Sequence, residues 1–312
     1  MSYEKMGYDI DWILPRVRSP TRLWRIASSI TVAAVGLFSK ILIRQRYIIG
    51  TSSLGRWIRG RGNVPLITVS NHHSCFDDPG IWVVILNALK VVEFSNSHDK
   101  VVYEVSKLSN ETCDVAPDLA TLRRRDLGGT LKLRHLLNPF VMRWSLAAHD
   151  ICFTCSQHSI FFSLGKCIPV VRGAGVYQAA VDFCIEQLAK GGWVHVFPEG
   201  KVNMTKEHMR LKWGVGRMIF ESPVTPVIIP IWHIGMDDVL PNEPPYVLKF
   251  RKNLTFNYGD PIDLTEMVRT LRERKATDVE ARKEITDFLQ DTLLKLKVET
   301  EELHVRHFKV KS

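Results

Sequence analysis

Four short apolar runs constrain the fold of this 312-residue chain more than any other feature. Each has the length of a buried strand, and helical periodicity fills the stretches between and after them. The runs are VPLITVS (64–70), KCIPVV (166–171), WVHVF (193–197) and VIIPIWH (227–233). The helical stretches are 79–90, 176–190, 205–221 and 278–304. This alternation predicts one α/β domain over residues 46–312, with a mixed, largely parallel sheet flanked by helices.

A polar stretch interrupts this pattern from about residue 83 to residue 130. It contains segments such as VEFSNSHDK and SKLSNETCDVAPD, shows no sustained periodicity, and closes with Gly128 and Gly129. A long segment of this kind inside a compact domain is typical of an inserted loop. We therefore predict a loop insertion at about 83–130.

The first 45 residues have a different character. Residues 26–39, IASSITVAAVGLFS, are uncharged, and Trp12, Trp24 and several arginines precede them. The run is shorter than the roughly 20 residues that a membrane-spanning helix needs. An aromatic and basic fringe beside a short apolar helix favours an interfacial anchor, so residues 1–45 are predicted to associate with a membrane. The alternative is a buried core helix.

The charge balance indicates an acidic partner. Lysine and arginine number 42 against 33 acidic residues, which gives a net charge of +9 and a pI near 9.3. Nucleic acid and an anionic membrane surface are the two usual candidates. The sequence contains no zinc finger, RNP-type aromatic strand or basic heptad helix, so we expect no nucleic acid and favour the membrane surface.

The six cysteines have irregular spacing and lie mostly in apolar runs, which is typical of reduced thiols rather than a disulfide framework. Cys152 and Cys155 form a CxxC pair flanked by His149 and His158. Steps of three along a helix would spread these four side chains around about half of its circumference. We therefore predict no metal site.

The stretch NHHSCFDDPG, residues 71–80, contains candidates for acid–base chemistry. A neutral histidine can take a proton from a hydroxyl that attacks an ester or thioester, and a carboxylate on its other nitrogen fixes the tautomer. The spacing His-x4-Asp occurs at His72/Asp77, at His73/Asp78 and at His233/Asp238. The pattern alone is therefore weak, and its context must discriminate.

The positions of the three pairs in the predicted fold favour some of them and exclude none. The first two pairs lie between a predicted strand and a predicted helix, where α/β proteins usually place their sites. Asp78 precedes Pro79 and fits the role of a helix N-cap, which leaves Asp77 as the free carboxylate. His233 also ends a strand and remains a competitor.

Four blocks, in order along the chain, resemble the glycerolipid acyltransferase family. They begin with Asn71-His72-x4-Asp77 and continue through GKCIPVVR (165–172), FPEG (197–200) and VIIP (227–230). The resemblance implies an acyltransferase-type domain with His72 and Asp77 as the catalytic pair. It also implies that Arg172, Glu199 and Gly200 bind the glycerophosphate part of the acyl acceptor, for which the planar arginine fork is well suited.

Further stretches, such as LKLRH, GVYQ and KWGVGR, resemble one particular branch of this family. This resemblance implies a phospholipid–lysophospholipid transacylase that remodels cardiolipin, with cardiolipin, monolysocardiolipin and phosphatidylcholine as partners. Such an enzyme would be mounted on mitochondrial membranes facing the intermembrane space.

The chain lacks a GxSxG nucleophile elbow and a cysteine nucleophile in an electropositive loop, so we expect a direct attack without an acyl-enzyme intermediate. No cofactor is expected, because one ester is exchanged for another. Two alternatives stay open: an acyltransferase that depends on acyl-CoA, and a silent membrane-binding protein damaged by the insertion. The sequence also leaves open whether the chain forms an oligomer.

Overall fold

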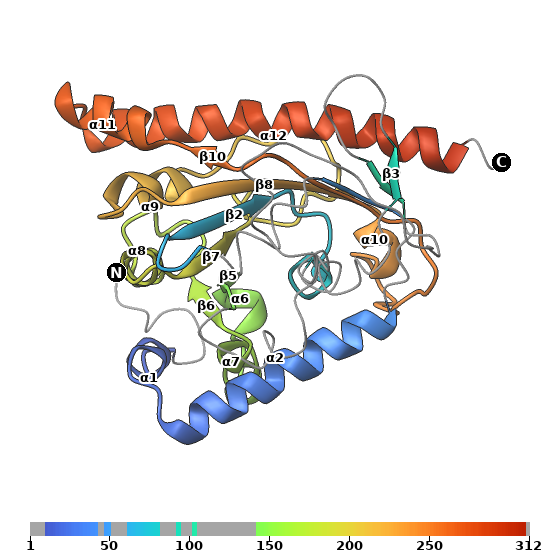
Figure 1. Ribbon diagram of the computed structural model, residues 1–312. Helices are drawn as coiled ribbons and strands as arrows, with labels where there is room; N and C mark the ends of the chain where they lie inside the picture. The colour runs from blue at the N-terminus through green and yellow to red at the C-terminus, as the bar shows by residue number, and fades with distance from the viewer. Residues whose placement is uncertain are drawn as a thin grey trace.

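The computed structural model describes residues 10–42, 47–50, 61–81, 92–94, 102–104 and 142–309 (Figure 1). Its described strands form one ten-stranded sheet. They are β1 (Tyr47–Gly50), β2 (Leu66–Ser70), β3 (Val92–Phe94), β4 (Val102–Glu104), β5 (Trp144–Ala148), β6 (Cys167–Val170), β7 (Trp193–Val196), β8 (Val227–Ile234), β9 (Thr255–Tyr258) and β10 (Ile262–Asp263). Its labelled helices are α1 (Ile13–Arg18), α2 (Arg22–Leu42), α6 (His149–Cys152), α7 (Ser156–Leu164), α8 (Ala179–Ala189), α9 (Gly214–Glu221), α10 (Met236–Val239), α11 (Thr265–Glu273) and α12 (Asp278–Lys309).

The sheet is mixed and largely parallel, as predicted. Its order is β3-β4-β1-β9-β8-β2-β7-β5-β6, with β10 paired to β8. From β8 to β6 all neighbours run parallel, and the register places Leu66 of β2 between Trp193 of β7 and Val227 of β8. The antiparallel pairing of β8 with β9 begins the mixed half. The carboxyl ends of the five parallel strands therefore meet at one edge.

Helices cover both faces of the sheet, because the side chains of each central strand alternate between two apolar clusters. Ile67 and Val69 of β2 join a cluster with α8, α9, α11 and α12, whereas Leu66 joins a cluster that includes Val32 of α2. In Figure 1, α12 lies across one face, and α2 runs along the opposite side of the molecule.

The carboxyl-terminal helix α12 closes the first of these clusters. Its residues Ala281, Ile285, Leu289, Leu293 and Leu296 recur every three or four positions and are all buried. They form one face that packs on α9 and β8. The long helix expected at 278–304 is confirmed, and its Phe288 is 40% exposed.

The helix expected at 205–221 is wrong in its first half, because α9 begins only at Gly214. The segment before it is held as a loop by tertiary hydrogen bonds. The Lys212 N–H donates to the Pro198 carbonyl at 2.7 Å, and the Leu211 N–H donates to the Gln290 side chain at 2.9 Å. Lys206 also has a φ of 58°, outside the helical range.

The insertion is not a loop throughout. Its segments β3 and β4 pair with each other, and β4 pairs antiparallel with β1 at the edge of the sheet. The prediction of a loop is wrong for these two segments, and the rest of 83–130 lies outside the described residues. Residues 77–81 are helical, and the remainder of the helix expected at 79–90 also lies outside them. The boundary at residue 45 between the N-terminal segment and the α/β domain stays a prediction.

Helix α2 is a surface helix, so the alternative of a buried core helix is wrong. It turns Ser28 and Ser39 toward the protein, and the Ser28 hydroxyl donates to the Leu164 carbonyl at 2.7 Å. Val32 is buried with them, whereas the larger apolar side chains face outward. Exposed on α2 are Leu23, Ile26, Ile30, Leu37 and Phe38. Among the described residues, no helix is both long enough and apolar enough to cross a membrane.

The contact between α9 and α12 allows a test of this packing. A Cβ atom at Gly216 would lie 2.5 Å from the Arg282 carbonyl oxygen, whereas one at Gly214 would meet nothing within 4 Å. We expect Gly216→Ala to lower the free energy of unfolding by about 1–3 kcal/mol through overpacking. Gly214→Ala is the matched control and should be neutral or slightly stabilising. Urea unfolding measures both, and equal effects would contradict the described helix contact.

Candidate active site

The site lies at the edge where the parallel strands end. β2 leads into Asn71 and His72, the adjacent β7 leads into Phe197 and Glu199, and the adjacent β8 carries His233 near its end. Residues distant in sequence therefore meet at one edge of the sheet, which is the usual position of sites in α/β proteins.

His72 and Asp77 form the centre of the site. The His72 Nδ1 lies 2.9 Å from Oδ2 of Asp77; the histidine side chain is 20% exposed, and the aspartate is fully buried. The carboxylate must accept this hydrogen bond, so Nδ1 carries the proton and Nε2 is left as the basic nitrogen. This is the tautomer that a general base requires.

The turn between β2 and the helix at 77–81 fixes the carboxylate. Oδ2 of Asp77 also accepts the backbone N–H groups of His73 at 2.7 Å and Ser74 at 2.9 Å. The Ser74 hydroxyl in turn accepts the Phe76 N–H at 3.2 Å. Short polar side chains thus hold the turn through hydrogen bonds to nearby backbone, as they commonly do before a helix.

The electrostatic surroundings keep Asp77 ionised. Burial by itself would raise the pKa of Asp77, but His233 and the hydrogen bond from His72 outweigh it, and the pKa is lowered. Burial lowers the pKa of His233 despite the opposing effect of Asp77. An ionised Asp77 can therefore orient His72 and stabilise the imidazolium that forms when His72 takes a proton.

His233 belongs to the same site rather than to a second pair. Its Nε2 lies 3.6 Å from Oδ2 of Asp77 and donates to the Asn71 carbonyl at 3.0 Å. The Asn71 side chain also pairs with the His233 backbone, accepting its N–H and donating to its carbonyl, both at 2.9 Å. From the sequence alone, His233 is a rival to His72 and is paired with Asp238. One feature of the sequence could have indicated that His72 and His233 share a site. Both lie at the ends of predicted strands, and these strands, β2 and β8, are neighbours in the sheet.

The ring of His73 does not meet Asp77. Its Nδ1 accepts a hydrogen bond from the Asn71 side chain at 3.2 Å, and the ring packs edge-on against Trp232. Burial lowers the pKa of His73 to about 4, so the ring is neutral at physiological pH. Of the two adjacent histidines, it is therefore His72 whose ring faces the carboxylate.

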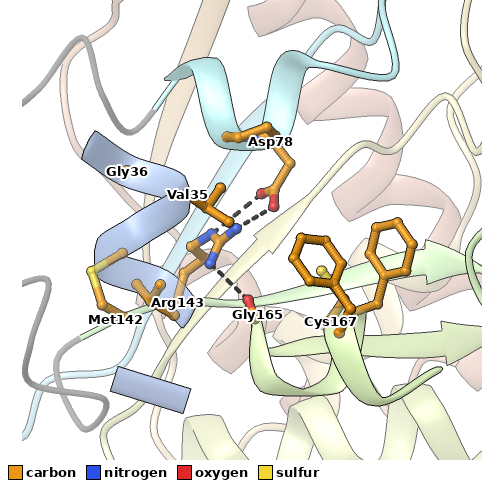
Figure 2. A pocket seen from close by; sticks show the side chains of 11 residues that line it. Val35, Gly36, Asp78, Met142, Arg143, Gly165 and Cys167 are labelled. Atoms are coloured by element: carbon orange, nitrogen blue, oxygen red, sulfur yellow. Dashed lines mark hydrogen bonds and ion pairs between the residues drawn. The ribbon is translucent and has the colours of Figure 1, made fainter. Parts of the chain in front are cut away.

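The interpretation of Asp78 as an N-cap is wrong. The helix already includes Asp77, and the Asp78 side chain forms an ion pair with Arg143 and accepts the Ser145 hydroxyl at 3.1 Å. Figure 2 shows the Arg143 guanidinium between Asp78 and the Gly165 carbonyl. The physical reason is that Arg143 is only 5% exposed, and a buried cation requires a counter-charge.

The corner after β7 supports His72 from the other side. The Phe197 ring stacks on His72 with centroids 4.2 Å apart. Glu199 is only 4% exposed, and its Oε1 lies 3.4 Å from the His72 N–H. Gly200 has a φ of 73°, a left-handed conformation that glycine adopts without strain, and its N–H closes the turn onto the Phe197 carbonyl at 3.0 Å.

Arg172 lies at the periphery of this arrangement. It follows β6, three strands from β2, which corresponds to about 14 Å at the usual strand spacing. Its guanidinium pairs with Asp150 on α6, and this hydrogen bond lowers the pKa of Asp150. The structure therefore brings His72, Asp77, Glu199 and Gly200 together, with Arg172 at the same edge in a surface ion pair.

No group of three or more His, Cys, Asp or Glu side chains within the described ranges is arranged to hold a metal ion. The side chains around the CxxC pair, which the sequence places near one another, do not form such a group. His158 contacts the Thr154 hydroxyl at 3.0 Å, while Cys152 and Cys155 are partly exposed free thiols.

Glu199 should make stability depend on pH. Burial raises the pKa of Glu199 to about 7 from an ordinary 4.5, so its contribution to stability is complete below the ordinary pKa and is lost as pH rises through about 7. Relative to Glu199→Gln, we expect the unmodified protein to lose at most about 3 kcal/mol of unfolding free energy over that interval. Urea unfolding at several pH values measures this. A difference between the two proteins that does not change with pH would show that Glu199 ionises normally.

Comparisons with known proteins show the family of the chain. Residues 130–234 match the Acyltransferase family. Tafazzin of Drosophila melanogaster is 45% identical over 303 residues, covering 96% of this chain and 68% of that protein. An N-acylphosphatidylethanolamine synthase of Arabidopsis thaliana is 32% identical over 277 residues, covering 85% and 80%.

Among solved structures, the 1-acyl-sn-glycerophosphate acyltransferase PlsC of Thermotoga maritima matches with a TM-score of 0.46 and 15% identity, covering 92% of this chain and 87% of that one. The sequence similarities are extensive enough to show the family, and they confirm the resemblance drawn from the four blocks. The chain belongs to the tafazzin family of phospholipid acyltransferases.

Proposed function

We propose that this protein is a transacylase that moves an acyl chain from a phospholipid to a lysophospholipid without coenzyme A and thereby remodels cardiolipin. The observation that carries the proposal is the His72–Asp77 pair, with Nδ1 held by a buried carboxylate and Nε2 left as the base. The substrates proposed are those that the resemblance of the sequence implies, namely cardiolipin, monolysocardiolipin and phosphatidylcholine.

The reaction needs only the groups of this chain. Nε2 of His72 takes the proton of the lysolipid hydroxyl, and the oxygen attacks the ester carbonyl of the donor lipid. The tetrahedral intermediate then collapses and expels the second lysolipid as an alkoxide, which recovers the proton from His72. One ester forms and one breaks, so the exchange requires neither an activated acyl group nor a cofactor.

Glu199 and Arg172 bind the acyl acceptor in this proposal. Oε2 of Glu199 is buried and has no hydrogen-bond partner among the described residues, so it can bind a glycerol hydroxyl next to His72. Arg172 must exchange Asp150 for a lipid phosphate, which is feasible because its side chain is 43% exposed. Gly200 gives the loop the turn that places Glu199 beside His72.

A cavity of about 100 Å³ lies behind the Asp78–Arg143 ion pair (Figure 2). Its walls are mostly apolar and come from α2, α7 and the starts of β5 and β6. The lining includes Val32, Val35, Met142, Phe161 and Phe162. We assign to it the binding of part of the transferred acyl chain, since apolar walls favour a hydrocarbon over water.

The outward apolar face of α2 supports a peripheral mount on the membrane. Leu23, Ile26, Ile30 and Leu37 recur at helical spacing and are each more than half exposed. Such a face can lie within the interfacial layer of one leaflet while the opposite side of the helix, with Ser28, Val32 and Ser39, rests on the protein. The resemblance of the sequence suggests mitochondrial membranes, with the site facing the intermembrane space.

One assay tests the proposed function. Purified protein is given a labelled lysophospholipid and a donor phospholipid, with and without acyl-CoA. Transfer without acyl-CoA is expected. Transfer only with acyl-CoA would identify an acyl-CoA-dependent acyltransferase, and no transfer in either condition would leave the silent membrane-binding alternative.

The role of His72 is tested by substitution. His72→Ala should lower the rate of transfer by roughly 10²–10⁴-fold, the usual loss when a general base is removed. His73→Ala, the neighbouring control, should retain most of the rate, because the ring of His73 does not meet Asp77. Equal losses in two folded variants would refute the assignment of His72.

The role of α2 is tested on vesicles. Replacing Ile26, Ile30 and Leu37 with serine should weaken vesicle binding, because these side chains lose apolar contact with the lipid. Transfer on detergent-dispersed lipid should persist. The matched control is the triple serine variant of Val279, Phe288 and Val298, which are exposed on α12. Unchanged vesicle binding in the α2 variant would reject this mount.

A further inference from the structure

The loop at 241–253, which joins α10 to β9, exposes an unusual amount of apolar surface. Within its sequence PNEPPYVLKFRKN, Tyr246, Val247 and Phe250 are 67%, 56% and 59% exposed. Single exposed apolar residues are ordinary, but three within five positions at the tip of one loop form a patch that water does not favour.

Cations are interleaved with this apolar patch. Lys249 and Arg251 flank Phe250 and are exposed, and Lys252 follows them. None of these three residues takes part in an ion pair with a residue that the structure describes. Glu243, at the start of the loop, is the one acidic side chain within 241–253. The tip therefore offers uncompensated positive charge beside exposed aromatic and aliphatic groups.

Hydrogen bonds fix the two ends of the loop, and two of these bonds connect it to the turn at residues 73–74 in the candidate active site. The Asn242 side chain donates to the His73 carbonyl at 2.6 Å, and the Ser74 hydroxyl donates to the Leu240 carbonyl at 2.9 Å. The Lys249 N–H donates to the Val239 carbonyl at 2.7 Å. The exposed tip is thus tied to the turn that carries His72 rather than to a remote part of the fold.

The loop also shares a cluster with α2. Leu248 packs against the apolar cluster that contains Val32, and Ala33 of α2 packs against the same cluster. In Figure 1 the segment after α10 lies at the end of the molecule where α2 ends, and α12 lies on the other side of the sheet. Leu37 and Phe38, near this end of α2, are exposed as well.

We propose that the 241–253 loop is a second membrane contact, which docks on anionic lipid with Tyr246, Val247 and Phe250 in the interfacial layer and its cations at the headgroups. Tyrosine suits this position because its ring is apolar and its hydroxyl is polar, and lysine and arginine stems follow the apolar surface while their charges reach the headgroups. The proposal rests on the proposed function only in that both substrates reside in a bilayer.

Two loop variants separate the apolar and the charged contributions. Tyr246→Ser, Val247→Ser and Phe250→Ser are combined in one variant, and Lys249→Gln, Arg251→Gln and Lys252→Gln in the other. Binding is measured by flotation with vesicles of phosphatidylcholine alone and with vesicles that also contain cardiolipin. The α12 triple variant (Val279, Phe288 and Val298 to serine) is the control for general loss of surface hydrophobicity.

The apolar variant should bind both kinds of vesicle at least tenfold more weakly. The charge variant should lose up to about a hundredfold on cardiolipin vesicles, since each cation near an anionic surface contributes about a factor of five, and little on neutral vesicles. The control should bind like the unmodified protein. Unchanged binding in both loop variants would overturn the proposal and leave the patch to a protein partner.

A second measurement guards against misfolding. A polarity-sensitive fluorophore is attached at Val247→Cys and, separately, at Val298→Cys, with the labelled parent chain as the blank for its native thiols. Cardiolipin vesicles should shift the emission to the blue at position 247 and leave it unchanged at 298. No shift at 247 would overturn the proposal even if the serine variants fail to fold.

Transfer on detergent-dispersed lipid separates this proposal from the proposed function. If the loop variants keep that transfer and lose transfer on vesicles, the loop acts through membrane contact. If the unmodified protein transfers nothing in detergent, the proposed function fails, while flotation and fluorescence still decide whether the loop binds lipid.

Discussion

A carboxylate that is fully buried and ionised determines the arrangement of this site. Asp77 is out of contact with water, so its charge must be met by donors within the protein, and Oδ2 receives them from the ring of His72 and the backbone of His73 and Ser74. Three donors from consecutive residues can converge only if the chain reverses directly after β2. The strand, the turn and the helix at 77–81 therefore depend on one another through a single oxygen.

The two strands parallel to β2, which are β8 and β7, hold the same turn from both sides. On one side, the Asn71 side chain pairs with the backbone of His233 as an extra rung between β2 and β8. On the other side, β7 brings Phe197 and Glu199 against His72. Burial lowers the pKa of His233 and raises that of Glu199, so both tend toward their neutral forms. The net negative charge of the cluster is concentrated on Asp77, whose Oδ2 lies 2.9 Å from Nδ1 of His72.

The sequence predicts four of the five parallel strands within about two residues, because strands buried on both faces are continuous apolar runs. It misses β5, whose side chains are mostly only partly buried. It cannot predict β1, β3, β4 and β9, which are short and form only through tertiary pairing. The pairing of His72 with Asp77 agrees with the structure, although the argument from Asp78 as a cap was wrong, since Arg143 is 65 positions away. For the same reason the sequence left His233 as a rival to His72 rather than as part of the same site, since contacts across strands leave no spacing in the sequence. The catalytic roles themselves stay predictions.

On α2, Leu23, Ile26, Ile30, Leu37 and Phe38 are exposed, whereas Ser28 and Ser39 are buried together with Val32. Five large apolar side chains exposed on one helix leave an apolar face in contact with water, which marks an interaction surface rather than an ordinary surface helix. The arrangement is reasonable if a lipid surface replaces water there. Under the proposed function, a lipid from that leaflet would place its acyl chain in the cavity behind Asp78, which Val32 and Val35 of α2 line. The apolar exterior and the buried charge at Asp77 would then serve one purpose, since the first holds the protein at the lipid that carries the ester and the second orients His72, the proposed base.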